Sequence, residues 1–189
     1  NRLPMRGMEG LPITPDGKPL VGIMQSTMDN PTTAVNKSDL TRIVTIDLET
    51  KKVKQYLYKQ EGGAKAYSNS AITALSNTSF LVLERDGDFY RDNPSAFKRV
   101  YKIDLRNATN LEDIAETAQI KQDAKLGLTI DGQTLEQYVL AKGWDGLKTQ
   151  GILPPTKTLV LDMIEKVKFP HDKMEGLWLI DDKRLGLIN

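Results

Sequence analysis

The chain has 189 residues and no cysteine, which excludes disulfide bonds, cysteine nucleophiles and thiolate metal sites. Its 26 lysines and arginines balance 25 aspartates and glutamates, leaving a formal net charge of +1. Without a basic field we expect no nucleic-acid partner. No apolar run is long enough to cross a bilayer, so we expect no membrane span.

The first part of the chain predicts two β-hairpins. Residues 9–14 form a short extended segment, the Pro-Asp-Gly sequence at 15–17 favours a turn, and residues 19–26 indicate a second strand. Two more segments within residues 41–59 alternate apolar and polar side chains on either side of a turn. We expect these strands to form one antiparallel sheet.

The same order of strands recurs further along the chain. Residues 71–76, 80–86 and 99–105 match the first three strands, and KRVYKIDL repeats the pattern of the earlier TRIVTIDL. The fourth strand of this unit is expected at 157–163, after an insertion. A third unit opens at Met174 with MEGLWLIDDKRLGLIN and contains two strands.

Repeated four-stranded units predict an all-β fold, a β-propeller with antiparallel blades. The whole sequence, 1–189, is then an incomplete propeller domain of about two and a half blades. The first blade is expected over 6–59, the second over 68–163, and the start of the third over 172–189. Because propellers remove their sheet edges by closing a ring, we expect the remaining blades from missing chain or from a second polypeptide.

The insertion within the second blade, residues 115–155, has a different character. Thr134 and Gln137 form a capping-box pattern that predicts the start of a short helix, and Gly143 predicts its end. Two arrangements fit this segment: a lid over one face of the blade, or an excursion on its outer surface.

The blade geometry predicts where polar residues gather. The first strand of a blade begins, and the second ends, on the same face of a propeller, so the three units bring distant residues to one channel mouth. The residues placed there are Glu9, Gln25, Ser26, Ser70, Glu84, Arg85, Asp86, Glu175 and Asn189.

Carboxylates this close repel one another unless a cation compensates. Calcium or magnesium held by oxygen ligands is one solution, and ion pairing with Arg85 is another. A purely structural alternative is that the glutamates cap backbone N–H groups while Arg85 neutralises its neighbours. No nucleophile elbow, His-Glu-x-x-His motif or Walker loop is present, and a catalytic triad would need His171, the only histidine.

Several segments together resemble a known family. The ordered set EGLPITPDGKPLVGIMQS, TRIVTIDLET, SFLVLERDGDF, RVYKIDL and MEGLWLIDDKRLGLIN is similar to the bacterial phytase-like family with esterase-like activity, whose members are secreted or periplasmic propellers. The resemblance implies a periplasmic or secreted hydrolase of small phosphate or carboxyl esters, with calcium as its cofactor.

The positions that match the family's motifs are Glu9, Glu84, Arg85, Asp86 and Glu175. The resemblance implies catalytic roles for Glu84, Arg85 and Asp86.

It also implies a metal site formed by Glu9, Glu84, Asp86 and Glu175. The bound ion would polarise the ester oxygen and activate water, while Arg85 would bind the anion. The alternative is a non-catalytic propeller that binds a protein or carbohydrate partner.

Overall fold

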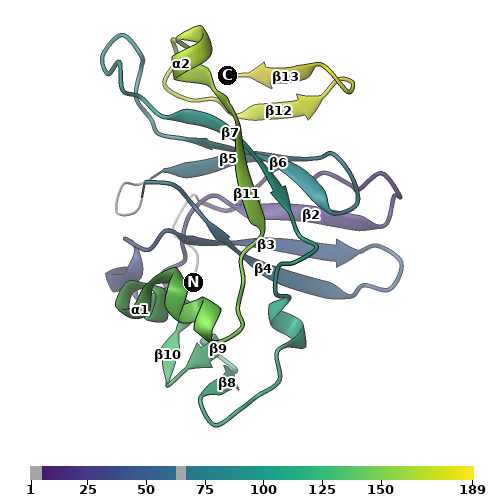
Figure 1. The fold of residues 1–189 in the computed structure, drawn as a ribbon, viewed down its shortest axis with the longest axis vertical. Coiled ribbons are helices and arrows are strands. Elements are labelled where there is room, and N and C mark those ends of the chain that lie inside the picture. Colours follow the sequence, from purple (N-terminus) through teal and green to yellow (C-terminus); the bar gives the residue numbers. More distant parts are fainter. Residues whose placement is uncertain (1–5, 63–66) are drawn as a thin grey trace.

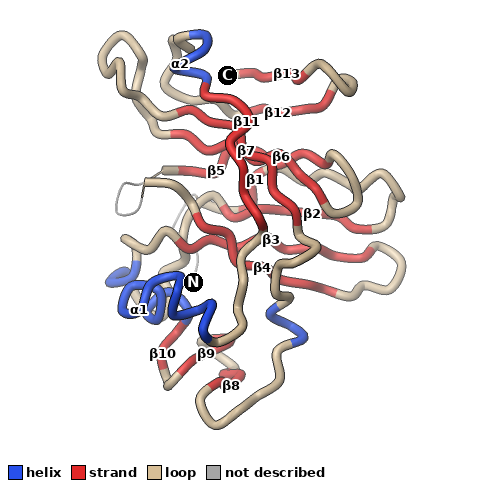
Figure 2. The backbone as a smooth tube through the Cα atoms, in the orientation of Figure 1, coloured by secondary structure: helices blue, strands red, loops and turns tan. Residues whose placement is uncertain are grey.

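The structure, a computed structural model, describes residues 6–62 and 67–189. It is mostly β, with a few short helices (Figure 2). Three antiparallel sheets follow one another along the long axis of the molecule, and a further, three-stranded sheet lies next to the first (Figure 1). No helix in the described ranges is both long and apolar enough to cross a membrane.

The first sheet contains four strands in chain order. They are β1 (Met8–Glu9), β2 (Pro19–Met24), β3 (Leu40–Asp47) and β4 (Val53–Lys59), with a 3-10 helix, η1 (Thr33–Val35), before β3. The extended segment predicted over 9–14 is shorter than expected. Gly10 has a left-handed φ of 70° and ends β1, after which only a single bridge joins Ile13 to Leu20.

The second sheet has the order β11-β7-β6-β5. Its strands are β5 (Ser68–Ala74), β6 (Ser79–Arg85), β7 (Lys98–Asp104) and β11 (Thr156–Asp162). The fourth strand therefore comes from beyond the insertion, which confirms the strand predicted at 157–163. Strand β11 pairs with β7 in an antiparallel register that shifts once, between Leu159 and Leu161.

The third sheet has two strands, β12 (Gly176–Leu179) and β13 (Leu185–Ile188). A short helix, α2 (Met163–Val167), leads toward it from β11. The side chain of Asp162 caps α2 by accepting hydrogen bonds from the backbone nitrogens of Ile164 and Glu165. Lys168 ends the helix in a left-handed conformation, which turns the chain toward β12.

The insertion contains more structure than the predicted helix. It comprises the strands β8 (Ile120–Asp123), β9 (Gly127–Ile130) and β10 (Gln133–Thr134) and helix α1 (Leu135–Thr149), and a 3-10 helix, η2 (Leu111–Asp113), lies just before it. Thr134 and Gln137 form the predicted capping box. The predicted end at Gly143 agrees with the structure, since this residue is non-helical, with φ 68° and ψ −178°, and interrupts α1. The sequence did not predict the second helical stretch, which follows Gly143 and runs to Thr149. Glycine tolerates that backbone conformation.

The insertion packs on the first sheet rather than on the second sheet that contains it. Leu40 and Leu57 of the first sheet share an apolar core with Leu135 and Leu147 of α1. Two polar contacts fix the same interface, an ion pair between Arg42 and Glu136 and a 2.8 Å hydrogen bond from the Trp144 indole to Asp39. The insertion therefore ties the two four-stranded sheets together.

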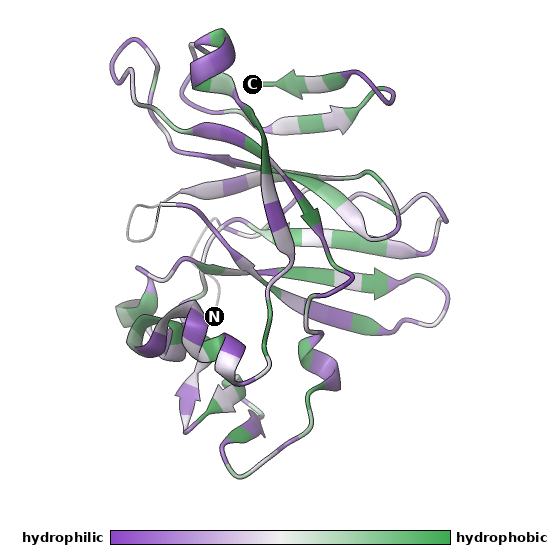
Figure 3. Cartoon of the chain, viewed as in Figure 1, coloured by the Kyte–Doolittle hydropathy of each residue, from purple (hydrophilic) through white to green (hydrophobic). Residues whose placement is uncertain are grey.

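Two further apolar cores hold the stack of sheets. Residues such as Ile23, Ile43 and Val82 are fully buried between the first and second sheets, and Figure 3 shows that β2 and β6 are largely hydrophobic there. Leu83, Val100 and Met174 belong to the core between the second and third sheets. The described residues close no ring, so the propeller stays a prediction.

Candidate functional site

Two neighbouring residues at the end of β6 point to opposite faces of the second sheet. Side chains alternate along a strand, so Glu84 shares a face with Phe80 and Val82, which pack toward the first sheet. Arg85 lies on the other face, with Leu83, toward the third sheet. The structure therefore separates two residues that the sequence placed at one channel mouth.

Glu84 is fully buried and fully partnered. One carboxylate oxygen accepts hydrogen bonds from the Tyr58 hydroxyl and from Lys157 Nζ, and the other accepts one from the backbone nitrogen of Glu61 at 2.8 Å. The Lys157 ammonium lies over the rings of Tyr58 and Tyr101, at 4.8 and 4.1 Å from their centroids. The charge of Glu84 is thus neutralised inside the protein.

This environment acts on the two tyrosines as well. Burial and the adjacent Glu84 raise the pKa of Tyr58 well above its ordinary value. Burial also raises the pKa of Tyr101 to about 12. Both phenols therefore stay protonated over the physiological range, and Tyr58 remains a hydrogen-bond donor to Glu84.

Asp86 is engaged in a separate ion pair. Its carboxylate accepts a hydrogen bond of 2.5 Å from Lys98 Nζ and one of 2.7 Å from the backbone nitrogen of Phe97. Lys98 is fully buried, and its ammonium also donates to the carbonyl of Asp88 at 2.9 Å. Asp86 compensates this buried charge and fixes the start of β7.

On the opposite face of the sheet, Arg85 connects residues from two different sheets. Its Nε donates to Ser70 Oγ at 2.8 Å, and its Nη2 donates to Glu175 Oε1 at 2.7 Å. Ser70 occupies a β-bulge in β5, where the pairing with β6 shifts between Asn69 and Ala71. A bulge re-aims a side chain relative to the regular ladder.

Glu9 completes this group from the first sheet. Desolvation by burial raises the pKa of Glu9, the negative charge of Glu175 raises it further, and Arg85 opposes both effects. Glu9, Ser70 and Glu175 line an open groove of about 370 Å³ where β1, β5 and β12 lie next to one another. We call these three residues and Arg85 the carboxyl groove.

A glycine lets β1 approach the second sheet closely at this groove. A Cβ atom on Gly10 would lie 2.7 Å from the backbone nitrogen of Ile72 in β5. Only a residue without a side chain fits this contact, and the positive φ of Gly10 adds the same requirement. The Glu-Gly pair therefore places Glu9 at the groove and lets the chain pass over β5.

The structure thus brings together Glu9, Arg85 and Glu175 among the predicted site residues, and leaves Glu84 and Asp86 in their own lysine pairs. Because side chains alternate between the two faces of a strand, the sequence could have predicted that Glu84 and Arg85 lie on opposite faces. Sequence reasoning missed Lys157, which lies 73 positions from Glu84 and reaches it only because β11 returns to the second sheet. No pattern in the sequence near either residue predicts this contact.

The predicted calcium site does not fit this arrangement. Calcium takes about six to eight oxygen ligands around one point. The predicted set of Glu9, Glu84, Asp86 and Glu175 is divided among three places, and two of its members are paired with lysines. Within residues 6–62 and 67–189, no three histidine, cysteine or acidic side chains are grouped to hold a metal ion.

Comparison with known proteins gives a family but no individual relative. Neither the curated proteins nor the solved structures contain a significant match to this chain. The match to a family extends over residues 1–189, and that family is described by the esterase-like activity of phytase. The chain belongs to this Phytase-like family, which supports assigning it broadly to the esterase-like or phytase-like hydrolases.

Proposed function

We propose that this protein hydrolyses small carboxyl or phosphate esters at the carboxyl groove. The observation that carries the proposal is the meeting of Glu9, Ser70 and Glu175 from three sheets in one open groove, with Arg85 bonded behind them. Family membership supports the class of reaction, and the groove supplies acidic and hydroxyl groups suited to it.

The two glutamates have unequal surroundings, which suits an acid and a base. Glu9 has a raised pKa and acts in its protonated form, giving a proton to the leaving oxygen of the ester. Glu175 is 43% exposed at its side chain and ion-paired to Arg85, and its carboxylate takes a proton from the attacking water. Water attacks the ester centre, the ester bond breaks, and the two products leave as acid and alcohol.

Arg85 acts as a positioning residue in this scheme. It is nearly buried, and its two hydrogen bonds hold the Glu175 carboxylate and the Ser70 hydroxyl in place. Ser70 is left with its own hydroxyl proton to donate toward a bound ester oxygen. Glu84 and Asp86 support the ends of β6 and β7 from outside the groove.

The decisive experiment compares matched glutamates. Glu175→Gln should lower turnover of p-nitrophenyl acetate or p-nitrophenyl phosphate by about a hundredfold or more, because the amide cannot accept the proton. Glu165→Gln is the control, since Glu165 is an exposed glutamate with a lysine partner, Lys166. Equal turnover in the two variants would exclude the carboxyl groove as the reaction site.

The role of calcium is open to a direct test in the same assay. Turnover that survives EDTA would support hydrolysis by the groove residues themselves. Turnover that EDTA abolishes and calcium restores would show that an ion takes part and would contradict hydrolysis by the groove residues alone. A Glu84→Gln variant should respond to EDTA and calcium as the wild type does, because Glu84 is paired with Lys157.

We further propose that the stacked sheets are blades of a β-propeller. The proposal is supported by the matching strand orders and by β5, which contacts both β1 and β12. Both outer faces of the stack also expose apolar side chains. Met8 and Leu11 are 41% and 61% exposed beside the first sheet, and Trp178 and Ile188 are 47% and 58% exposed on the third.

In this proposal further blades cover those two faces, supplied by the rest of a longer chain or by a second polypeptide. The mass and the small-angle scattering profile of the native protein test it. A compact ring with a central channel is the expected result, and a stable elongated monomer of 21.1 kDa would contradict it. On the family resemblance we also propose a periplasmic or secreted location, which cell fractionation tests.

A further inference from the structure

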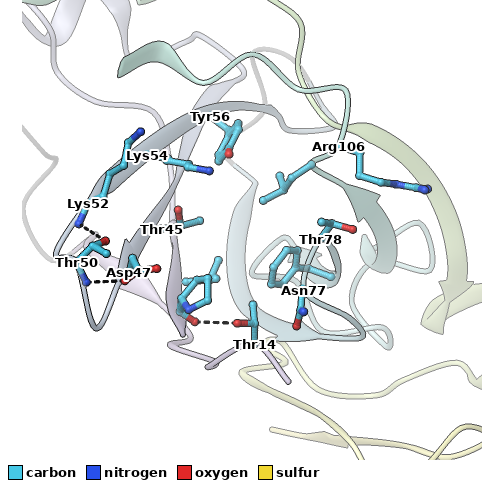
Figure 4. Close-up of a pocket in the computed structure, with 14 residues that line it drawn as sticks. Thr14, Thr45, Asp47, Thr50, Lys52, Lys54, Tyr56, Asn77, Thr78 and Arg106 are labelled. Atoms are coloured by element: carbon cyan, nitrogen blue, oxygen red, sulfur yellow. Dashed lines mark hydrogen bonds between the residues drawn. The ribbon is translucent and has the colours of Figure 1, made fainter. Parts of the chain in front are cut away.

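A second cleft lies at the other ends of the strands, away from the carboxyl groove. It opens between the first and second sheets, where β2 begins, β3 ends and the turn between β5 and β6 passes (Figure 4). Its volume is about 440 Å³, within the range of about 300–1,000 Å³ typical of small-molecule sites. We call it the lysine cleft, after Lys52 and Lys54 in its wall.

The floor of the lysine cleft is apolar. Val21, Phe80 and Leu105 line it, and all three belong to the buried core between the first two sheets. Their side chains are at most 8% exposed, so they form a closed apolar surface against which the body of a ligand would rest. The floor therefore suits the hydrocarbon or aromatic body of a small molecule.

Two mostly buried side chains in the wall of the cleft carry hydroxyl groups. Tyr56 and Thr45 are each only 8% exposed, but neither hydroxyl is among the fully enclosed polar atoms of the described residues, so both reach the solvent of the cleft. In Figure 4 the Tyr56 hydroxyl points toward the interior of the cleft. Both hydroxyls can therefore donate a hydrogen bond to a polar atom of a ligand that enters the cleft.

The charge in the cleft favours an anion. Lys52 and Lys54 form no ion pair with the described residues, and the Lys54 ammonium points into the cleft in Figure 4. The one carboxylate in the lining, Asp47, already accepts hydrogen bonds from the backbone nitrogens of Glu49 and Thr50. Arg106, at the rim, is bonded to Asp104 and points away.

We propose that the lysine cleft binds a small organic anion, with its carboxylate or phosphate-type group at Lys54, Tyr56 and Thr45 and its apolar body on Phe80 and Leu105. The tyrosine and threonine hydroxyls donate to the anionic oxygens, and the ammonium compensates the charge. This site is separate from the carboxyl groove in place and in chemistry: it holds unpaired cations and an apolar floor, whereas the groove holds paired carboxylates.

The test uses phenylphosphonate and benzoate, which present the two kinds of anionic group and contain no ester bond to hydrolyse. Binding to the full-length protein is measured by calorimetry, and a soaked crystal shows which place the probe occupies. Lys54→Met should weaken binding about tenfold or more, and Tyr56→Phe about threefold to tenfold. The tighter of the two probes identifies whether the natural anion is of the phosphate or the carboxylate type.

Two controls make the result decisive. Lys102→Met removes an exposed lysine from β7, which does not line the cleft, and should leave binding unchanged. Benzyl alcohol carries the apolar body without the charge and should bind at least tenfold more weakly than the better anion. Equal binding of the alcohol, equal losses in Lys54→Met and Lys102→Met, or no binding of either anion would overturn the proposal.

Discussion

Glu84 and Glu175 show two opposite uses of a carboxylate on the two faces of one sheet. Glu84 has no solvent exposure and is held by Tyr58, Lys157 and the backbone of Glu61. Glu175 is paired with Arg85 but remains 43% exposed at its side chain, beside Glu9 in an open groove. A carboxylate that is buried with a full set of partners stabilises the fold and cannot reach a substrate. A carboxylate in a partly exposed ion pair can still contact a substrate.

The largest effect is expected from breaking the buried side of this comparison. Lys157→Met leaves the Glu84 carboxylate without its cation in a dry environment, so the free energy of unfolding should fall by about 3–5 kcal/mol. Urea denaturation measures the loss. The double variant Lys157→Met/Glu84→Gln should recover part of it, because no buried charge remains; a double variant as unstable as the single one would refute this account.

The next effect concerns the backbone that carries Glu9. Gly10→Ala introduces a Cβ atom 2.7 Å from the backbone nitrogen of Ile72, whereas Gly17→Ala has the same left-handed φ with no atom nearby. We expect Gly17→Ala to cost about 1–2 kcal/mol of stability from strain alone. Gly10→Ala should cost about 1–3 kcal/mol more because of overpacking. Equal thermal stability of the two variants would show that β1 does not press on β5.

A smaller change tests the open side of the comparison. Arg85→Lys keeps the charge but cannot hold Ser70 and Glu175 at once, so turnover should fall about tenfold to a hundredfold with little change in KM. Arg184→Lys, at an exposed arginine paired with Asp181, is the matched control. A change in KM alone would instead assign Arg85 to substrate binding.

The smallest effect comes from the proton on Glu9. Its pKa is raised above the ordinary value of 4.5, so the folded protein binds this proton more tightly than the unfolded chain does. Its contribution to stability is present below pH 4.5 and is lost as pH rises through the raised pKa. Glu9→Gln should therefore gain stability relative to the wild type across that interval, as measured by melting temperature against pH.

The same titration predicts a change in activity. If Glu9 donates its proton to the leaving group, turnover of the wild type falls as pH rises through the pKa of Glu9. In Glu9→Gln this alkaline limb should disappear together with most of the rate. An unchanged pH profile would show that another group causes the fall in turnover at higher pH.

Much of the strand pattern was predictable, because it depends on local properties. Alternating side chains and turn residues predicted β2, β3, β4 and the strands of the second sheet, and the capping box at Thr134 predicted the start of α1. Gly143 also predicted the break in α1, where the backbone is non-helical. The helical stretch after Gly143 was not predictable from a local pattern, because it depends on the packing of Leu147 against the first sheet.

Trp178 shows the limit of the same reasoning. An aromatic residue in an apolar strand predicts a core position, yet Trp178 covers Gly186 on the outer face of the third sheet and is 47% exposed. The strand alternation specifies that one face is apolar, but a neighbouring sheet must be present for that face to be buried.

The sequence by itself determined the order of strands, the repeated units and the presence of Glu9, Arg85 and Glu175 near corresponding strand ends. Only the tertiary structure decided which charges meet. Glu84 and Arg85 are adjacent, but the stacking of sheets gives one of them Lys157 and the other Glu175. The physical reason is that side-chain periodicity is local, whereas the partner of a buried charge comes from whichever distant strand the fold places opposite it.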